Sequence, residues 1–249
     1  MYSLRTTLLL ATVFVALSAV AQEKPNIVYI LADDLGYGDV RWLNPESKIP
    51  TPHMDRLAAE GMTFTDTPTR YGLLTGRYAW RTRLKNGVLW GYSPPLIDQG
   101  ELTVPQFLKG QGYTTACIGK WHLGLGWQTK DGSPLNDEMK LTGEKVAFDK
   151  PLTHGPNDLG FDYFYGISAS LDMPPYVYIE NDRATAVPTE VLPTTFRSGL
   201  TAEGFKAVDV LPEFTEKAVA YLKQRKESGD IKPFFLYFPL TAPHTPVVP

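Results

Sequence analysis

The sequence predicts an α/β fold with a largely parallel central sheet flanked by helices. Continuous apolar runs recur along the chain, as is typical of strands that are buried on both faces. Segments with apolar residues at helical spacing lie between these runs, and strands that alternate with helices favour a parallel sheet. The 249 residues contain no internal repeat and no low-complexity tract, so one large domain is expected.

The expected elements follow one another along the chain. The first strand occupies residues 26–32 (NIVYILA), and the first helix follows at 51–62, with Pro52 near its start and Gly61 at its end. A second helix is expected to begin near Pro68. The remaining elements are a helix and a strand at 103–112 and 113–119, and a helix and a strand at 211–229 and 233–240.

The composition excludes some partners and one kind of crosslink. The formal net charge of −3 is too small to draw the chain onto nucleic acid or an anionic membrane. An anionic substrate must therefore be attracted by a local cluster of charge. Cys117 is the single cysteine, so no internal disulfide is possible, and its apolar, strand-like neighbours predict a buried thiol.

The N-terminus has the three-part plan of a cleavable secretory signal. Arg5 is followed by an apolar run at 8–17 and then by Ala19-Val20-Ala21, which predicts cleavage after Ala21. Residues 1–21 would be the signal and 22–249 the mature, secreted or periplasmic chain. The alternative is a transmembrane anchor, but the apolar run is shorter than the roughly 20 residues that span a bilayer. No stable membrane anchor is expected.

Two acidic residues follow the first expected strand directly. Asp33 and Asp34 stand at its carboxyl end, where ligands bind in open α/β sheets. Adjacent carboxylates repel each other unless a cation lies between them, and oxygen ligands favour calcium or magnesium. The alternative is a solvated turn, because Asp-Asp-Leu-Gly is good turn material.

Basic residues follow two further strands. Lys120 and His122 stand just after the strand that contains Cys117, at alternate positions, so both can point the same way. The lysine could hold an anion, and the histidine could pass a proton at neutral pH. His244 follows the last strand. Each group alone is also compatible with a surface turn, but three polar clusters at strand ends together predict a site.

The motifs around these residues resemble the sulfatase family, of the arylsulfatase type found in bacteria. The similar stretches occur in family order from Pro25 to the end of the chain. They are PNIVYILADDLGYGD, TPHMDRLAAEGMTFTD, TPTRYGLLTGRYAWR, GKWHLG, GFDYFYGISASLDMPPYVYIEND and FFLYFPLTAPHTP. The resemblance implies the alkaline-phosphatase-like α/β sandwich and hydrolysis of a sulfate ester, carried either on a small aryl compound or on a sulfated glycan.

The resemblance also implies a metal site. Asp33 and Asp34 resemble the first two ligands of the family's calcium ion, with magnesium as the less favoured ion. Arg70, in the Pro-x-Arg run, resembles the arginine that holds the catalytic aldehyde hydrate and the metal site together.

Substrate-binding roles are implied for four further residues. Lys120 and His122 resemble the pair that contacts the sulfate and the hydroxyl of the nucleophile. Ser170 falls where the family often has a serine near the sulfate. His244 resembles the histidine that contacts the sulfate and helps to protonate the leaving oxygen.

The nucleophile is where the sequence departs from the family. The family converts a Cys or Ser, two residues before the proline of this run, into formylglycine, whose hydrate attacks sulfur. Here that position, two residues before Pro68, is Asp66. A short segment between FTD and TPTR is interpreted as deleted, Thr65 and Thr67 are out of register, and Cys117 lies on another strand. No formylglycine can therefore form, and the chain is expected to be inactive.

Further family features lie beyond the His-Thr-Pro motif. They are the remaining calcium ligands, a second sulfate-binding lysine and a smaller C-terminal domain, so 22–249 is interpreted as the N-terminal part of a catalytic domain. Two other functions stay open at this point. One is a phosphatase or phosphodiesterase of the same fold, and the other is a non-catalytic chain that binds sulfated glycans.

Overall fold

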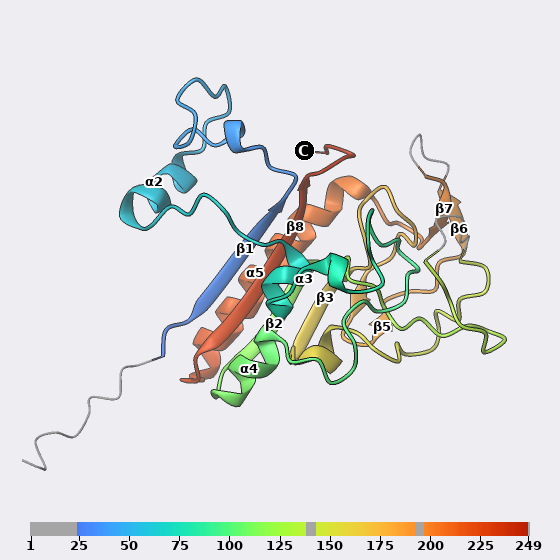
Figure 1. Ribbon diagram of the computed structural model, residues 1–249. Helices are drawn as coiled ribbons and strands as arrows, with labels where there is room; N and C mark the ends of the chain where they lie inside the picture. Colours follow the sequence, from blue (N-terminus) through green and yellow to red (C-terminus); the bar gives the residue numbers. More distant parts are fainter. Residues whose placement is uncertain (1–23, 138–142, 193–196, 249) are drawn as a thin grey trace, which may run out of the picture.

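A mostly parallel sheet forms the centre of the computed structural model, which describes residues 24–137, 143–192 and 197–248. The sheet has six strands in the order β1-β8-β2-β3-β4-β5, and the first four of these are parallel (Figure 1). The bounds are β1 Ile27–Asp33, β8 Phe234–Pro243, β2 Thr114–Lys120, β3 Tyr163–Ile167, β4 Ile179–Glu180 and β5 Arg183–Ala184. A separate antiparallel pair is β6 (Glu190–Leu192) and β7 (Gly199–Thr201). The predicted α/β fold is confirmed.

Helices cover the two faces of this sheet. The α-helices are α2 (Pro52–Glu60), α3 (Arg70–Thr75), α4 (Val104–Gly110) and α5 (Ala207–Ser228), and the short 3₁₀ turns are η1 (Tyr37–Asp39), η2 (Ala79–Arg81) and η3 (Pro156–Leu159). Figure 1 shows α3 and α4 on one side of the sheet and the long α5 on the other. The predicted helices are confirmed, although α5 begins at Ala207, before the expected Leu211.

The alternation of side chains along β2 divides the core into two layers. Cys117 packs with the aromatic cluster under α3 and α4, whereas its neighbours Ala116 and Ile118 pack against Phe214 and other residues of α5. The Cys117 side chain is fully buried, and burial raises the pKa of its thiol well above the ordinary value. The prediction of an inert, buried thiol is therefore confirmed.

The prediction that the first strand is buried on both faces is wrong. Tyr29 and Leu31 in β1 pack against the aromatic cluster, but Val28 and Ile30 on the opposite face are 49% and 60% exposed. β1 pairs only with β8 and is an edge of the described sheet. Its apolar sequence is that of an interior strand, but the layer formed by α5 does not cover it.

The segment after β1 projects away from the sheet before the chain returns at α3 (Figure 1). Helix α2 has no buried residue, and Leu57, Met62 and Phe64 are all more than 70% exposed. Among the described residues, no helix has the length and apolar character needed to cross a bilayer. Residues 1–21, the predicted secretory signal, lie outside the described part of the chain.

Candidate functional site

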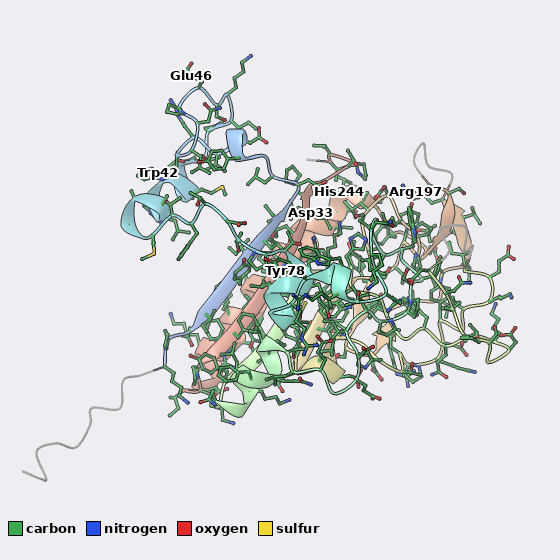
Figure 2. The ribbon with its side chains drawn as sticks, viewed as in Figure 1. Asp33, Trp42, Glu46, Tyr78, Arg197 and His244 are labelled. Atoms are coloured by element: carbon green, nitrogen blue, oxygen red, sulfur yellow. The ribbon has the colours of Figure 1, made fainter. Side chains whose placement is uncertain are left out.

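The polar residues predicted from separate motifs meet at one end of the sheet. Asp33 is the last residue of β1, Lys120 is the last residue of β2, Ser170 follows β3 and His244 follows β8. Because these four strands are parallel, their carboxyl ends lie at the same edge. Figure 2 shows Asp33 and His244 at this edge.

A glycine lets the backbone of β8 approach β2 just before the site. Gly119 has φ +138°, a conformation that side chains rarely adopt, and a Cβ atom there would overlap the carbonyl oxygen of Pro239. Any other residue would push the two strands apart. Gly119 therefore fixes the position from which Lys120 enters the site.

Lys120 and Arg70 both bind the carboxylate of Asp33. The Lys120 ammonium donates to Asp33 Oδ2 and also to the hydroxyl of Ser170, and Arg70 Nη2 lies 3.1 Å from Asp33 Oδ1. Lys120 is 1% exposed, and the side chains of Asp33 and Arg70 are 6% and 13% exposed. Residues from β1, β2, α3 and the segment after β3 thus form one buried cluster.

The charges of this cluster shift the pKa values of its members. Burial alone would raise the pKa of Asp33, but the attraction of Arg70 and Lys120 outweighs it and holds that pKa below its ordinary value. Burial and the nearby Arg70 lower the pKa of Lys120, although Asp33 opposes this shift. With both cations charged, two positive groups lie against one carboxylate, which leaves an excess of one positive charge.

Arg70 also has a donor that the protein does not use. Its Nε atom is buried and has no hydrogen-bond partner within the described part of the chain. A buried N–H donor that lacks an acceptor is costly, so such donors are normally satisfied by a ligand or by water. This donor and the excess positive charge are the features expected of an anion-binding site.

His122 lies just beyond the end of β2, where the charges of Lys120, Arg70 and Asp33 act on it. The strand ends at Lys120 and His122 has φ +56°, so the regular alternation of side chains is lost there. Its Nε2–H donates to the carbonyl oxygen of Leu89 at 2.8 Å, which leaves Nδ1 as the acceptor of the neutral ring. Burial, followed by the charge of Lys120, lowers the His122 pKa to about 3. The role of His122 as a proton carrier stays a prediction from the sequence.

The depressed pKa of His122 predicts acid-sensitive stability. Below pH 6.5 the unfolded chain binds a proton on this histidine, whereas the folded chain does not until about pH 3, so stability should fall as pH falls through this window. At pH 5 the expected cost is about 2 kcal/mol. The substitution His122→Asn, which tolerates the positive φ, should flatten this dependence in urea unfolding measured at pH 7 and pH 5.

The exposed His53 supplies a matched control. His53→Asn makes the same chemical change on an exposed side chain of α2, so it controls for the substitution itself. An equal dependence in wild type and His122→Asn would show that other groups cause the acid sensitivity.

His244 and Asp34 form the outer rim of the site. His244 Nε2 lies 3.7 Å from Asp34 Oδ2, and the Asp34 side chain is 74% exposed. His244 Nδ1–H donates to the carbonyl oxygen of Thr245, so Nε2 attracts the carboxylate only when the ring is protonated. Asp34 itself has φ +61°, a left-handed conformation that aspartate tolerates better than most residues.

The described residues do not by themselves fit a calcium ion. Calcium takes six to eight oxygen ligands, but both oxygens of Asp33 are bound by cationic side chains and Asp34 faces solvent. Among the described residues, no three acidic, histidine or cysteine side chains are placed to share a metal. The predicted pair of ligands, Asp33 and Asp34, is therefore incomplete, and the chemistry below does not depend on a metal.

Calcium binding to this chain should accordingly be weak. Affinity rises with the number and charge of the ligands, so we expect a Kd no tighter than about 10⁻⁴ M by isothermal titration. Asp34→Asn should weaken it further, whereas Glu60→Gln on the exposed helix α2 should not. Sub-micromolar binding would show that a complete ligand set exists.

The position of Asp66, two residues before Pro68, predicts that it stands at the start of a helix. The structure does not place it there. Helix α3 begins only at Arg70, after the extended residue Thr69, and residues 61–69 are exposed. No hydrogen bond or ion pair joins Asp66 to the buried cluster in the described part of the chain. Because α3 has only six residues, its end also offers little help to a bound anion.

Two charged residues near the site were missed by the sequence analysis. Asp172 is buried, forms an ion pair with Arg197 and raises the pKa of Lys120 by its charge. Arg197 also lies over the ring of Trp90, 5.0 Å from its centroid. Asp172 stands two residues after Ser170, so this spacing could have indicated that it lies near the site. No sequence pattern near Arg197 indicates that Arg197 does.

Comparisons with known proteins identify the family of this chain. The family described as Sulfatase matches residues 25–249. The N-acetylgalactosamine-6-O-sulfatase of Bacteroides thetaiotaomicron is 32% identical over 91% of this chain and 50% of its own length. Arylsulfatase G of Mus musculus is 31% identical over 90% of this chain and 42% of its own length. The chain thus spans about half the length of these curated relatives.

Solved structures show the same fold. A Bacteroides thetaiotaomicron structure from work on glycosaminoglycan metabolism superposes with a TM-score of 0.73 at 32% identity, over 91% of this chain and 53% of that one. A sulfatase from Pseudoalteromonas sp. superposes with a TM-score of 0.58 at 24% identity, over 97% of this chain and 48% of that one, which supports the fold alone. The predicted alkaline-phosphatase-like architecture is therefore confirmed, and the chain belongs to the sulfatase family.

Proposed function

We propose that this site binds the sulfate group of a sulfate ester and that, with Asp66 in place of a nucleophile, it does so without hydrolysis. The observation that carries the proposal is the buried cluster in which Lys120 and Arg70 outnumber Asp33, and in which Arg70 Nε finds no acceptor among the described residues. A sulfate oxygen would satisfy this donor and compensate the excess positive charge.

Each residue of the site has a separate task in this proposal. Arg70 and Lys120 hold the sulfate oxygens and stabilise their negative charge within a largely buried cluster. Ser170 orients the Lys120 ammonium, and Asp33 keeps both cations in place. His244 lies at the rim, where a protonated ring would face the ester oxygen as well as Asp34. In the parent family this arrangement serves sulfuric ester hydrolysis.

The relatives favour a sulfated sugar as the ligand, with an aryl sulfate as the alternative. One relative is named for N-acetylgalactosamine 6-sulfate and others for aryl sulfates. The second candidate function is that of a phosphatase, because phosphatases can have the same fold. Inorganic phosphate is therefore a useful competitor, because a phosphatase site should prefer it to sulfate.

Anion binding tests this proposal directly. We expect inorganic sulfate to raise the melting temperature of the chain and Arg70→Ala to weaken sulfate binding at least tenfold, by loss of a charge-assisted hydrogen bond. Arg70→Lys should retain part of the affinity. Arg56→Ala, which removes an arginine 71% exposed on α2, should have no effect. Equal sulfate binding by wild type and Arg70→Ala would contradict the proposal.

We also propose that the chain is exported and that its mature form begins near Gln22. The three-part N-terminus supports this location, secreted or periplasmic. The intact mass of the exported protein should match a chain that starts after Ala21. A mass that includes Met1 or the apolar run at 8–17 would contradict it.

A further inference from the structure

A basic hollow lies at the end of the sheet opposite to the site. It has a volume of about 700 Å³ and is formed where β1 and β8 begin and α5 ends (Figure 1). No residue of the buried cluster around Asp33 lines it, so the proposed function does not account for it. The charged residues of its lining are Lys24, Arg225, Lys226, Asp230 and Lys232.

The four cations of the hollow come from three separate segments. Lys24 precedes β1, Lys232 precedes β8, and Arg225 and Lys226 stand in the last turn of α5. Basic residues in the last turn of a helix are explained by the helix dipole, but that reason does not extend to Lys24 or Lys232. One carboxylate, Asp230, faces these four cations, so the hollow carries an excess of three positive charges.

Arg225 takes up the carboxylate of Asp230. Its Nη1 lies 3.2 Å from Asp230 Oδ2, and its Nη2 donates to the carbonyl oxygen of Lys232 at 2.6 Å. The guanidinium also lies over the rings of Tyr221 and Phe234, 5.9 Å and 5.2 Å from their centroids. Arg225 is therefore a fixed part of the wall, and the lysines of the hollow keep their charge uncompensated.

The lysines of the hollow have no acidic partner. Lys226 and Lys232 are exposed, and no ion pair joins either of them to a carboxylate in the described part of the chain. The Lys24 ammonium donates to the carbonyl oxygen of Gln111 at 2.5 Å, which is a neutral acceptor. Three uncompensated ammonium groups at one end of the molecule attract an anionic surface that comes within about 10 Å.

An apolar side chain stands among these charges. Ile231 is 98% exposed, the highest value for any large apolar residue described. It lies in the connection from α5 to β8, between Asp230 and Lys232. Lys232 N donates to Asp230 Oδ1 at 3.0 Å and Arg225 holds the carbonyl oxygen of Lys232, so this turn is fixed. An isoleucine held in water in this way gains free energy when it enters an apolar phase.

We infer that the basic hollow docks the chain reversibly on an anionic phospholipid surface. The lysines contact the lipid phosphates, and Ile231 enters the boundary between headgroups and acyl chains. This chemistry favours a bilayer over a free anion, because a free anion offers Ile231 no apolar environment.

The docking is local and weak. The net charge of −3 gives the chain no long-range attraction to a membrane, so binding depends on the cluster of lysines at short range. A few lysines and one apolar side chain do not make a stable anchor. In the docked chain the opposite end of the sheet, with Asp33 and Lys120, faces away from the bilayer and stays open to a soluble ligand.

Sedimentation with phospholipid vesicles tests this surface. The mature chain, residues 22–249, lacks the apolar run at 8–17 and should bind vesicles made of equal parts of phosphatidylglycerol and phosphatidylcholine. Lys226→Ala and Lys232→Ala should each weaken this binding about fivefold, by loss of one cation near the anionic surface. Ile231→Ser should weaken it about tenfold, because the apolar contact is lost. These side chains are exposed, so the variants should keep the melting temperature of the wild type.

Lys150 supplies the matched control. It is exposed and does not line the hollow, so Lys150→Ala should bind as the wild type does. Equal binding to vesicles of phosphatidylcholine alone, or unchanged binding by the double variant Lys226→Ala, Lys232→Ala, would overturn the inference. Release of the chain from vesicles by inorganic phosphate at constant ionic strength would also overturn it, because the hollow would then be a site for a free anion. Sulfate binding at Arg70 is measured separately and does not depend on these results.

Discussion

No hydrolysis of p-nitrophenyl sulfate is expected from this chain, even in the presence of a formylglycine-generating enzyme. The family forms its nucleophile two residues before the proline, and that residue here is Asp66. A carboxylate cannot be converted to the aldehyde hydrate, and its charge repels an approaching sulfate. Loss of the nucleophile from a catalytic unit typically lowers kcat by roughly 10⁴-fold to 10⁶-fold.

The geometry of the loop adds a second reason to expect no turnover. Asp66 lies in an exposed loop before α3, and the buried cluster of Asp33, Lys120 and Arg70 does not contact it. Asp66→Cys would recreate Cys-Thr-Pro-Thr-Arg without lengthening the loop. We expect no turnover by this variant, because among the described residues no hydrogen bond or ion pair joins residue 66 to the cluster.

An insertion before Thr67 tests whether the position of the nucleophile, as well as its chemistry, limits turnover. A family-like Ala/Ser-rich segment ending in Cys, placed before Thr67 in a chain extended to the length of its relatives, should restore turnover with the modifying enzyme. The release of p-nitrophenol measures it. Turnover by the unmodified 249-residue chain that disappears in Asp66→Ala would instead make aspartate the nucleophile.

The sequence predicts those parts of the fold that depend on local patterns. The apolar runs of β1, β2 and β8 and the turns around α2 and α4 were recognisable because alternation, capping and glycine act within a few residues. The convergence of Asp33 and Lys120 also followed, since parallel strands end at the same edge of a sheet.

Other features depend on contacts between distant residues, which no local pattern encodes. The apolar sequence around Val28 and Ile30 predicts burial, but their exposure depends on which elements cover the strand. His122 turns toward Leu89 because its backbone has positive φ, which periodicity does not reveal. The pairing of both Asp33 oxygens with cations likewise arises only when β1, β2 and α3 meet.

Removal of the Lys120 charge should be among the most destabilising single changes in this chain. Lys120→Met keeps the apolar stem but leaves the buried Asp33 carboxylate with one partner and the Ser170 hydroxyl without its donor. Breaking a buried ion pair from one side typically costs about 3 kcal/mol. Arg70 still compensates Asp33, so we expect about 2 to 3 kcal/mol from urea unfolding.

A surface pair provides the matched control. Lys109 binds Asp162, but its side chain is 53% exposed, so Lys109→Met should cost less than about 1 kcal/mol. The double variant Asp33→Asn, Lys120→Met should recover part of the loss, because the amide carries no charge that needs a partner. Such a double-mutant cycle should give a coupling of about 2 kcal/mol between Asp33 and Lys120.

The same cycle distinguishes a structural ion cluster from solvated charges that happen to lie close together. If Lys120→Met costs no more than Lys109→Met and shows no coupling to Asp33, then water reaches the cluster and screens its charges. Sulfate would then gain little from binding there. A large cost with strong coupling means that the cations are held in a dry environment, where a sulfate oxygen that meets Arg70 interacts most strongly.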